Sequence, residues 1–393
     1  MGAQAIKLIM VHHTVSTIIL NQQYKINMEV KQLLKVTTGF IHGYVVKDWD
    51  ELATYAIESE KLGIESIWSP EGWGYDGLTP LAYLAAKTSK IKLGTGVLQI
   101  GTRTATNTAM GALSMNSLSK GRFILGLGTS GPQVMEGFHG IIFDEPILRT
   151  KENIDVIKMI FRGEKVSYQG KHLKHPSREG QGKVMKNESD PDPDIPIWIA
   201  SLGPKNLELT GAVADGWKGT SFIAESAESM FKHIRSGAEA AGRSFSDITI
   251  NVGGTVYFTD DVDKAVEELK PMLAFSLGAM GSRKFNFYNA AYVRAGYADE
   301  AKHIQNLWIE GKRDEARKAV PAEMVMKTGF IGTDEMIKER IRLYRDVGVN
   351  EIAAQLRFAS PIFGKGNSVI PTVTERIDTL ARFVDLVDQV NKE

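Results

Sequence analysis

Cysteine is absent from this 393-residue sequence. Its absence excludes disulfides, thiolate nucleophiles, iron–sulfur clusters and cysteine-ligated zinc. The eight histidines form no HExxH pattern and no closely spaced cluster with carboxylates, so we expect no metal site. Any catalysis must therefore depend on other groups.

Net charge is also lacking, because 47 basic residues balance 47 acidic ones. No overall field attracts nucleic acid, anionic lipid or a polyanionic substrate. No stretch approaches the roughly 20 apolar residues needed to cross a bilayer. With 43% hydrophobic and 24% charged residues, the composition suits a globular core rather than a disordered chain or a membrane protein. We expect a small-molecule substrate and neither a nucleic-acid nor a membrane partner.

The amino-terminal segment lacks the marks of a signal peptide. Its weakly apolar run, Ile6–Leu20, has neither the basic residues before it nor the small-residue cleavage site after it that export requires. We interpret residues 1–27 as an atypical extension, for which disorder is one alternative. Met28 then begins a single domain, residues 28–393, which we expect to lie in the cytoplasm.

From about Leu33 onward, short β-branched runs alternate with longer amphipathic stretches, as in parallel strands joined by helices. Residues 49–62 predict a helix that ends at Gly63 before a strand, and residues 336–347 repeat this pattern before Gly348. We expect eight strands, at residues 34–40, 64–69, 91–96, 122–127, 195–200, 216–219, 248–258 and 349–356. Eight strands favour a closed (β/α)8 TIM barrel over a doubly wound sheet, with a helix at 373–390 completing the outer ring.

Two segments exceed what a barrel needs. The first, near 164–196, is rich in Gly, Lys, His, Asp and Pro and predicts a long loop or hairpin insertion. The second, near 273–321, has a helical pattern. Long insertions on barrels are often active-site lids, and surface decoration or a dimer contact is the alternative.

Glycine-containing turns follow the fourth and fifth predicted strands. Residues 126–131 read GLGTSG and residues 201–206 read SLGPKN, and each turn precedes a helix. Such turns expose backbone N–H groups beside a helix amino terminus, so either could cradle a phosphate. The GxGxxG spacing is not a Rossmann fingerprint, because it follows the fourth strand rather than the first. Tight strand-to-helix geometry is the alternative explanation.

The second predicted strand ends in SPEGWGY, residues 69–75. Glu71 could carry a proton or orient a cofactor, and a solvated loop carboxylate is the alternative. Trp73 and Tyr75 could stack on a planar ring or simply pack the loop. Phe287 and Tyr288 also suggest an apolar or planar substrate, although aromatic residues at this spacing are more often part of a core.

The stretch LSKGRFILGLGTSGPQVMEGFHG, residues 118–140, resembles the luciferase-like flavin-dependent superfamily, and within it the coenzyme F420-dependent oxidoreductases. The similarity continues through IASLGPKN at 199–206, ADGW at 214–217, GAMG at 278–281 and NFYN at 286–289. It covers nearly everything from Met28 to the carboxyl end.

The resemblance implies a homodimeric barrel with the tricyclic cofactor ring at its mouth. Gly96-Val97 matches the non-proline cis peptide that backs this ring in the deazaflavin group. Gly128, Thr129 and Ser130 would meet the phosphate or the ribityl-like chain. Four residues would line the other side of the cofactor: Ala200, Ser201, Leu202 and Gly203. Trp73, Phe287 and Tyr288 would then bind the substrate.

Two departures from the family bear on proton transfer. Glu71-Gly72 replaces the Asp-His of many deazaflavin enzymes, and Gly131 replaces an acid of the related sugar-phosphate dehydrogenases. Glu71, Glu136 and His139 remain candidate proton carriers.

The expected reaction is hydride transfer between F420 and a carbonyl, alkene or carbon–nitrogen double bond, similar to methylenetetrahydromethanopterin reductases or to alcohol or alkene chemistry. One alternative is a monooxygenase that uses reduced FMN and O2. The other is a non-catalytic flavin-binding homologue.

Overall fold

The computed structural model describes residues 33–39, 48–178, 180–281, 286–356 and 371–393. The predicted extension, residues 1–27, lies outside the described residues. The chain from Leu34 to Glu393 forms one structural unit, and the description below concerns this unit.

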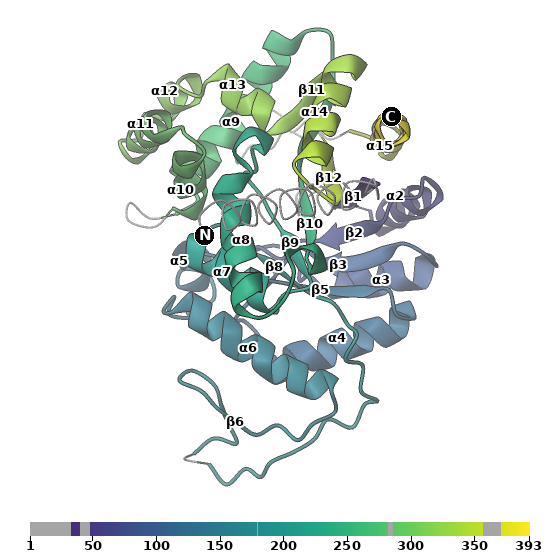
Figure 1. The fold of residues 1–393 in the computed structure, drawn as a ribbon, viewed down its shortest axis with the longest axis vertical. Helices are drawn as coiled ribbons and strands as arrows, with labels where there is room; N and C mark the ends of the chain where they lie inside the picture. Colours follow the sequence, from purple (N-terminus) through teal and green to yellow (C-terminus); the bar gives the residue numbers. More distant parts are fainter. Residues whose placement is uncertain (1–32, 40–47, 179, 282–285, 357–370) are drawn as a thin grey trace, which may run out of the picture. The chain divides into compact units, whose positions relative to one another are not determined.

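Eight parallel strands close into a ring in the order β1-β2-β3-β5-β8-β9-β10-β12, and β12 pairs back onto β1 (Figure 1). Each of the eight predicted strands corresponds to one ring strand, so the TIM-barrel prediction is confirmed. The ring strands are β1 Lys35–Gly39, β2 Ser66–Ser69, β3 Lys92–Thr95, β5 Phe123–Gly128, β8 Ile197–Ala200, β9 Gly216–Lys218, β10 Thr249–Phe258 and β12 Glu351–Leu356.

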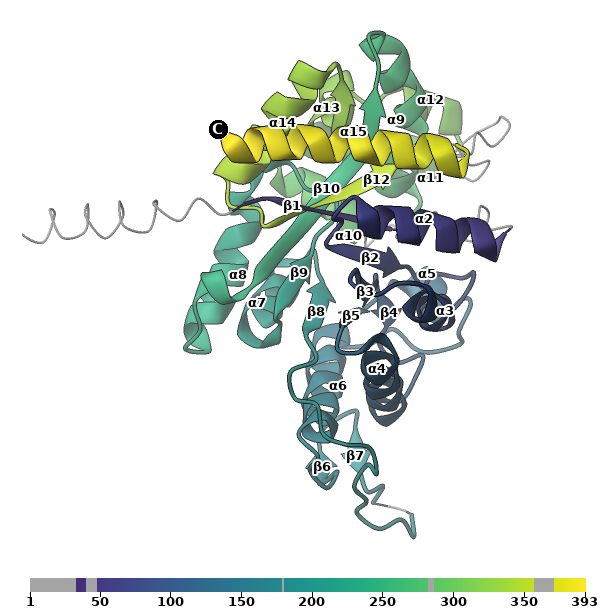
Figure 2. The same cartoon turned by 90° about the vertical axis from the view of Figure 1, so that its right-hand side faces the viewer.

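Four further strands were not predicted individually. β4 (Leu98–Gln99) continues beyond β3 and pairs with the end of β5. β11 (Gly329–Gly332) pairs with the second half of β10, beyond the point where β10 leaves β9. β6 (Tyr168–Gln169) and β7 (Lys174–His175) form an antiparallel pair within the segment for which we expected a loop or a hairpin (Figure 2).

Helices surround the ring and join its strands. The predicted helices at 49–62, 336–347 and 373–390 are present as α2, α14 and α15. The α-helices are α2 Trp49–Lys61, α3 Thr79–Lys87, α4 Ala105–Ser119, α5 Pro132–Met135, α6 Pro146–Phe161, α7 Pro204–Val213, α8 Glu228–Ala240, α9 Val262–Gly278, α10 Phe287–Arg294, α11 Ala298–Ile309, α12 Arg313–Lys318, α13 Ala322–Lys327, α14 Asp334–Asp346 and α15 Val373–Lys392, with short 3-10 helices at Ala224–Ser226 and Phe245–Asp247. The described parts of the segment near 273–321 are mostly helical, as its pattern predicts.

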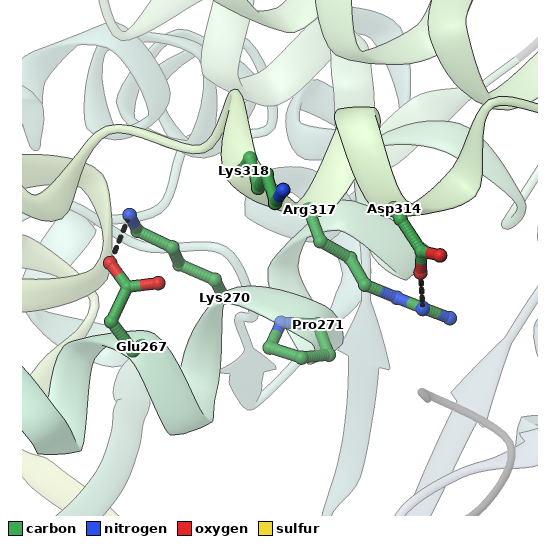
Figure 3. Close-up of a pocket in the computed structure, with 6 residues that line it drawn as sticks. All are labelled: Glu267, Lys270, Pro271, Asp314, Arg317 and Lys318. Atoms are coloured by element: carbon green, nitrogen blue, oxygen red, sulfur yellow. Dashed lines mark hydrogen bonds and ion pairs between the residues drawn. The ribbon is translucent and has the colours of Figure 1, made fainter. Parts of the chain in front are cut away.

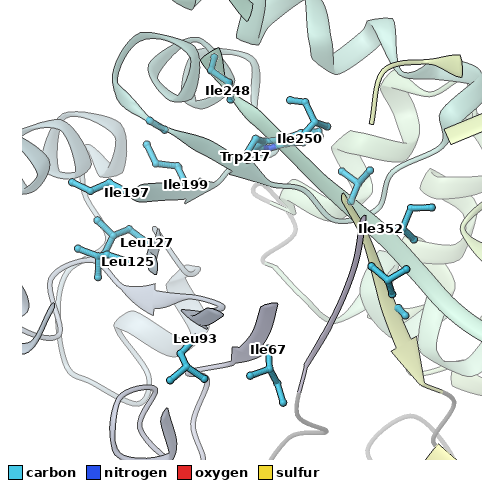
Figure 4. Close-up of a cluster of buried hydrophobic side chains, with 14 of the residues drawn as sticks. Ile67, Leu93, Leu125, Leu127, Ile197, Ile199, Trp217, Ile248, Ile250 and Ile352 are labelled. Atoms are coloured by element: carbon cyan, nitrogen blue, oxygen red, sulfur yellow. The ribbon is translucent and has the colours of Figure 1, made fainter. Parts of the chain in front are cut away.

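The main core lies between the strands and the helices. Alternate strand residues face outward, because successive side chains of a strand point to opposite faces. These residues are buried aliphatic and aromatic side chains, each worth about 1.5–3 kcal/mol when fully buried. Figure 4 labels ten members of this cluster: Ile67, Leu93, Leu125, Leu127, Ile197, Ile199, Trp217, Ile248, Ile250 and Ile352.

A separate, smaller cluster fills the interior of the ring. It consists of Trp68, Ile124 and Trp198, and the two indole centroids are 4.9 Å apart. Glycines make room for these rings. A Cβ on Gly94 would lie 2.5 Å from the Trp68 ring, and one on Gly216 would lie 2.3 Å from the Trp198 ring. Packed side chains therefore occupy this part of the barrel interior, which does not form a channel there.

The two ends of the described unit meet beside the first strand. The backbone N–H of Leu34 donates to Asn391 Oδ1 at 2.9 Å, and Asn391 Nδ2 donates to the Leu34 carbonyl at 2.9 Å. β1 pairs with β2 on one side and with β12, which is almost at the carboxyl end of the chain, on the other. Ring closure therefore joins segments more than 300 residues apart.

Glu60 on α2 fixes the turn that leads into β3. Burial opposes ionisation of its carboxyl, but hydrogen bonds from the N–H groups of Ile91, Lys90 and Ser89 outweigh this and lower its pKa from 4.5 to about 2. A lowered pKa stabilises the fold above the unfolded-state pKa, and this contribution is lost as the pH falls.

We expect Glu60→Gln to lower the free energy of unfolding at pH 7, with a difference from the wild type that shrinks between about pH 4.5 and pH 2. Urea denaturation across this range tests the expectation. Glu58→Gln is the control, because Glu58 lies on the same helix and forms an exposed ion pair with Lys61. A difference for Glu60→Gln that stays constant down to pH 3 would contradict the assignment.

Candidate active site at the barrel mouth

The barrel mouth is the end of the ring where the strands terminate at their carboxyl ends, the end at which barrels carry their active sites. Five inward-facing positions near these ends carry small residues, namely Gly39, Gly96, Gly128, Ala200 and Ala353, whereas Lys218 at the end of β9 and Gln355 in β12 are larger. Solvent reaches Gly39, Gly96 and Ala200, although the strands around them are buried. Beneath lie the larger side chains of Trp68 and Trp198. These five positions therefore add little side-chain volume to the mouth above the two indole rings.

The predicted cis peptide between Gly96 and Val97 is confirmed. It separates β3 from β4, and Thr95 Oγ1 bridges the interruption by donating to the Gly126 carbonyl and accepting from the Gly126 N–H, both at 2.8 Å. A Cβ on Gly126 would lie 1.9 Å from the Thr95 carbonyl oxygen, so only glycine fits there. Tight packing thus explains Gly126 without any ligand.

Three predicted cofactor-binding residues, Val97, Gly128 and Ala200, lie close together beside the Gly96–Val97 peptide. A Cβ on Gly128 would lie 2.6 Å from Val97 Cγ2 and 3.7 Å from Ala200 Cβ. Gly128 and Ala200 are also register partners in β5 and β8. The sequence-distant segments around 97, 128 and 200 therefore form one continuous wall of the mouth.

The two glycine turns lie side by side, because β5 and β8 are neighbours in the ring. In the first turn, Thr129 and Ser130 are partly exposed, and Ser130 has a left-handed backbone with φ of 58°. In the second, Gly203 is the N-cap of α7 and remains accessible. Backbone N–H groups at the start of a helix favour an anion, although the first residue of α7, Pro204, has no N–H and those of Asn206 and Leu207 donate to the Gly203 carbonyl.

Ser201 and Leu202 are less accessible than the prediction implies. Both residues are buried, and Ser201 Oγ shares a 2.7 Å hydrogen bond with Thr210 Oγ1. The carbonyl of Leu202 accepts a 2.6 Å hydrogen bond from Arg294 Nη2 on α10. These two residues hold the turn in place through their neighbours, whereas Ala200 and Gly203 face solvent.

Glu71 is the centre of a hydrogen-bonded clamp. Arg103 Nη1 and Nη2 donate to its two carboxylate oxygens, each at 2.7 Å, and the Gly77 N–H donates to Oε2 at 2.9 Å. Gln99 Nε2 donates to the Glu71 carbonyl at 3.2 Å. Only 9% of the Glu71 side chain is exposed, so this bidentate pair is largely shielded from water. These hydrogen bonds hold the loop after β2 against β4, the strand that follows the Gly96–Val97 peptide.

The other two predicted proton carriers have different surroundings. Glu136 is exposed and accepts a 3.0 Å hydrogen bond from the Phe143 N–H. His139 is partly buried, packs edge-on against Phe138, and its Nε2 has no hydrogen-bond partner among the described residues. His139 therefore has a ring nitrogen that makes no hydrogen bond within the described part of the chain.

The predicted substrate-binding aromatics are spread over two elements. Trp73 is 47% exposed on the loop after β2, and the neighbouring Tyr75 packs against Trp49 with ring centroids 5.2 Å apart. Phe287 and Tyr288 begin α10 and are partly buried against the main core, and burial raises the pKa of the Tyr288 hydroxyl. Trp73 is therefore free to contact a ligand, whereas the two α10 residues have a packing role as well.

Sequence reasoning missed a polar network in the barrel interior. Lys218 on β9 and Asn251 on β10 are register partners, and so are Asn251 and Glu351 on β12. Lys218 Nζ donates to Asn251 Oδ1 at 2.7 Å, and Asn251 Nδ2 donates to Glu351 Oε2 at 2.8 Å and to Thr37 Oγ1 at 3.0 Å. The only signal in the sequence was a lysine inside a short predicted strand, and its inward direction depends on the register.

A recess lies between α9 and α12 (Figure 3). Its volume is about 340 Å³, and its lining residues are Glu267, Lys270, Pro271, Asp314, Arg317 and Lys318. Two internal ion pairs, Glu267–Lys270 and Asp314–Arg317, satisfy most of these charges. None of these residues was predicted to bind a ligand, and we place the candidate active site at the mouth.

Neither a metal-binding cluster nor a membrane-spanning helix is found among the described residues. No cluster of three or more histidine or carboxylate side chains is arranged to hold a metal ion there. Within the same residues, no helix has both the length and the apolar character needed to span a membrane.

Comparison with known proteins identifies relatives over most of the chain. The family model described as luciferase-like monooxygenase matches residues 28–351. A Mycobacterium tuberculosis protein, provisionally named a coenzyme F420-dependent oxidoreductase, is 34% identical over 330 residues, which are 82% of this chain and 94% of the relative. The 5,10-methylenetetrahydromethanopterin reductase of Methanolobus tindarius is 31% identical over 329 residues, which are 83% of this chain and 95% of the relative.

A solved structure supports the fold independently. The coenzyme F420-dependent tetrahydromethanopterin reductase from Methanopyrus kandleri superimposes with a TM-score of 0.69 at 23% sequence identity. The match covers 89% of this chain and 97% of that structure. The resemblance noted from residues 118–140 is thereby confirmed.

Proposed function

This chain belongs to the luciferase-like monooxygenase family, and from this premise we propose that it is an oxidoreductase that transfers a hydride between coenzyme F420 and a small organic substrate. The names of its relatives support the choice of F420 over FMN. The observation that carries the proposal is the wall of small residues at the barrel mouth, where five inward positions hold only glycine or alanine. A planar ring needs such a wall, because a longer side chain at Gly96, Gly128 or Ala200 would occupy its space.

The residues present at the mouth fit the cofactor. Gly96 and Val97 would back the ring, and Gly128, Thr129 and Ser130 would meet the phosphate-bearing chain. On the opposite side, Ala200 and Gly203 would contact the cofactor while Ser201 and Leu202 hold their turn. When bound, F420 supplies a ring carbon that accepts or donates a hydride.

The protein contributes orientation, exclusion of water and one proton. Trp68 and Trp198 form the floor and keep water from reaching the mouth through the barrel. The Glu71–Arg103 clamp holds the loop that carries Trp73 and thereby positions this aromatic side chain near the substrate. We take His139 as the first candidate proton carrier, since its buried Nε2 makes no hydrogen bond within the described residues. Glu71 and Glu136 are the alternatives that mutagenesis can separate from it.

Phe287 and Tyr288 complete the proposed substrate site from the side of α10. Substrates with a carbonyl, alkene or carbon–nitrogen double bond suit the reaction, because each can exchange a hydride and a proton. We also propose, from the family resemblance, that the protein is a homodimer located in the cytoplasm. Light scattering after size-exclusion chromatography measures the oligomeric state.

A binding titration tests the proposal. We expect purified protein titrated with oxidised F420 and, separately, with oxidised FMN to bind F420 at least about tenfold more tightly, a difference of about 1.4 kcal/mol. Quenching of cofactor fluorescence measures both dissociation constants. Oxygen uptake with each reduced cofactor is followed in parallel.

The possible results separate three functions. Tight F420 binding without oxygen uptake agrees with the proposal. Binding of FMN alone, with oxygen consumption, would instead identify a monooxygenase. Binding of FMN without oxygen consumption would agree with a non-catalytic flavin-binding homologue, and failure to bind either cofactor would overturn the proposal.

A further inference from the structure

Lys218 lies on the floor of the barrel mouth. It is the inward-facing residue at the end of β9, and its ammonium nitrogen is 4.5 Å from the centroid of the Trp68 ring. A Cβ on Gly96 would lie 3.8 Å from Lys218 Cε, so the lysine stem runs directly below the Gly96–Val97 bulge. The side chain is partly exposed, although the strands around it are buried.

The partners of Lys218 leave its charge uncompensated at close range. Its ammonium contacts an amide oxygen of Asn251 and the face of an indole, both of which are neutral. Within the described residues, no carboxylate forms an ion pair with it. The carboxyl of Glu351 is connected to Lys218 through the Asn251 amide, and burial raises the pKa of this carboxyl. A raised pKa weakens Glu351 as a counter-charge.

Burial also acts on the lysine itself. It lowers the pKa of the Lys218 ammonium to about 8, against the opposing attraction of Glu351. At neutral pH the group therefore remains mostly protonated. A shielded cation without a direct counter-ion is costly to keep in a folded protein, and an anionic ligand above it offsets this cost.

Hydride transfer changes the charge of the cofactor that we propose for this site. A hydride carries two electrons and one proton, so a ring that accepts a hydride and takes up no further proton gains one unit of negative charge. Charge near a redox cofactor sets the balance between its two forms. A fixed positive charge below the ring stabilises the electron-rich form more than the oxidised form.

We propose that Lys218 is a positioning residue whose ammonium, held by Asn251 and Trp68, makes the protein bind the reduced deazaflavin in preference to the oxidised form. This inference rests on the proposed F420-dependent function. It assigns to one side chain, which the sequence did not single out, control over the redox balance of the bound cofactor.

The test compares the affinities of both redox forms in matched variants. Dissociation constants for oxidised and reduced F420 are measured anaerobically, by fluorescence and absorbance, for the wild type and for Lys218→Met, Lys218→Gln and Lys218→Arg. We expect Met and Gln to weaken the preference for the reduced form about tenfold, equivalent to about 30 mV for a two-electron couple. Arg is expected to retain the preference, because it retains the charge. Lys232→Met, which removes an exposed charge from α8, is the control and is expected to change nothing.

The Gln variant distinguishes charge from packing. Glutamine retains a donor to Asn251 without the charge, so it also provides the test if the Met variant fails to fold. Equal weakening of both redox forms, or an unchanged ratio in a folded Met or Gln variant, would overturn the inference. Failure of the wild type to bind F420 in either form would instead refute the proposed function.

Discussion

Ala200→Phe is expected to weaken F420 binding by about 100-fold, which corresponds to about 2.8 kcal/mol, without unfolding the barrel. Ala200 is an inward-facing residue at the end of β8, partly exposed to the mouth, and its register partner is Gly128. A phenyl ring at this position takes the space beside Gly128 at the inner side of the mouth. The ligand then loses both its contact surface and its path to the floor.

The measurement is a fluorescence titration with oxidised F420, accompanied by thermal denaturation to show that the variant is folded. Ala240→Phe is the matched control. Ala240 is exposed at the carboxyl end of α8, and this helix leads back to the amino-terminal end of β10, so it ends at the opposite end of the barrel. An Ala200→Phe protein that is folded and binds F420 within threefold of the wild type would show that the cofactor lies elsewhere.

The second large effect concerns stability. We expect Arg103→Ala to lower the free energy of unfolding by about 3–5 kcal/mol, because it leaves the shielded carboxylate of Glu71 without its bidentate partner. The cost comes from an uncompensated charge rather than from lost attraction alone. Urea denaturation at neutral pH measures this free energy.

Two further variants show whether the charge is the cause. Removing both charges, in Glu71→Gln/Arg103→Met, is expected to cost less than Arg103→Ala alone, because no charge remains buried. Lys61→Ala, in the exposed pair with Glu58, is expected to change stability by less than about 1 kcal/mol. A loss below about 1 kcal/mol for Arg103→Ala would show that the clamp is well hydrated.

The same variants separate two roles of Glu71. A proton carrier loses turnover when it is changed to glutamine, even if the loop stays in place. A clamp residue loses stability instead, and the KM for the substrate rises as Trp73 moves. The hydrogen bonds around Glu71 favour the second outcome.

Most ring strands were predictable because they carry a run of β-branched or aliphatic residues between helical or turn-forming segments. Ile195–Ala200 and Ile248–Phe258 are examples, and both correspond to strands of the structure. β11 was missed because the four residues GFIG pair only with the second half of β10. β4 was missed because two residues after a bulge carry no periodicity. Local pattern therefore identified the barrel but not its irregular additions.

The same difference between local pattern and distant contact separates the site residues that were predicted from those that were missed. Gly96, Val97, Gly128 and Ala200 were found through motifs at the ends of strands, and the closed ring brings them together. Arg103 was not found, since its partner is 32 residues away and nothing local couples them. Residues that act through contacts across the barrel, as Arg103 and Lys218 do, become visible only when register and burial are known.

The Leu34–Asn391 hydrogen bonds and the pairing of β1 with β12 bear on synthesis of this protein. While the chain emerges from the ribosome, β1 can pair with β2 early. Its other edge remains unpaired until β12, which ends at Leu356, has been synthesised. An unpaired strand edge can form hydrogen bonds with the strands of other chains and so promote aggregation. Nascent or prematurely terminated copies are therefore the species most in need of a chaperone. A carboxyl-terminal tag that detaches α15 from Leu34 is likewise expected to increase aggregation.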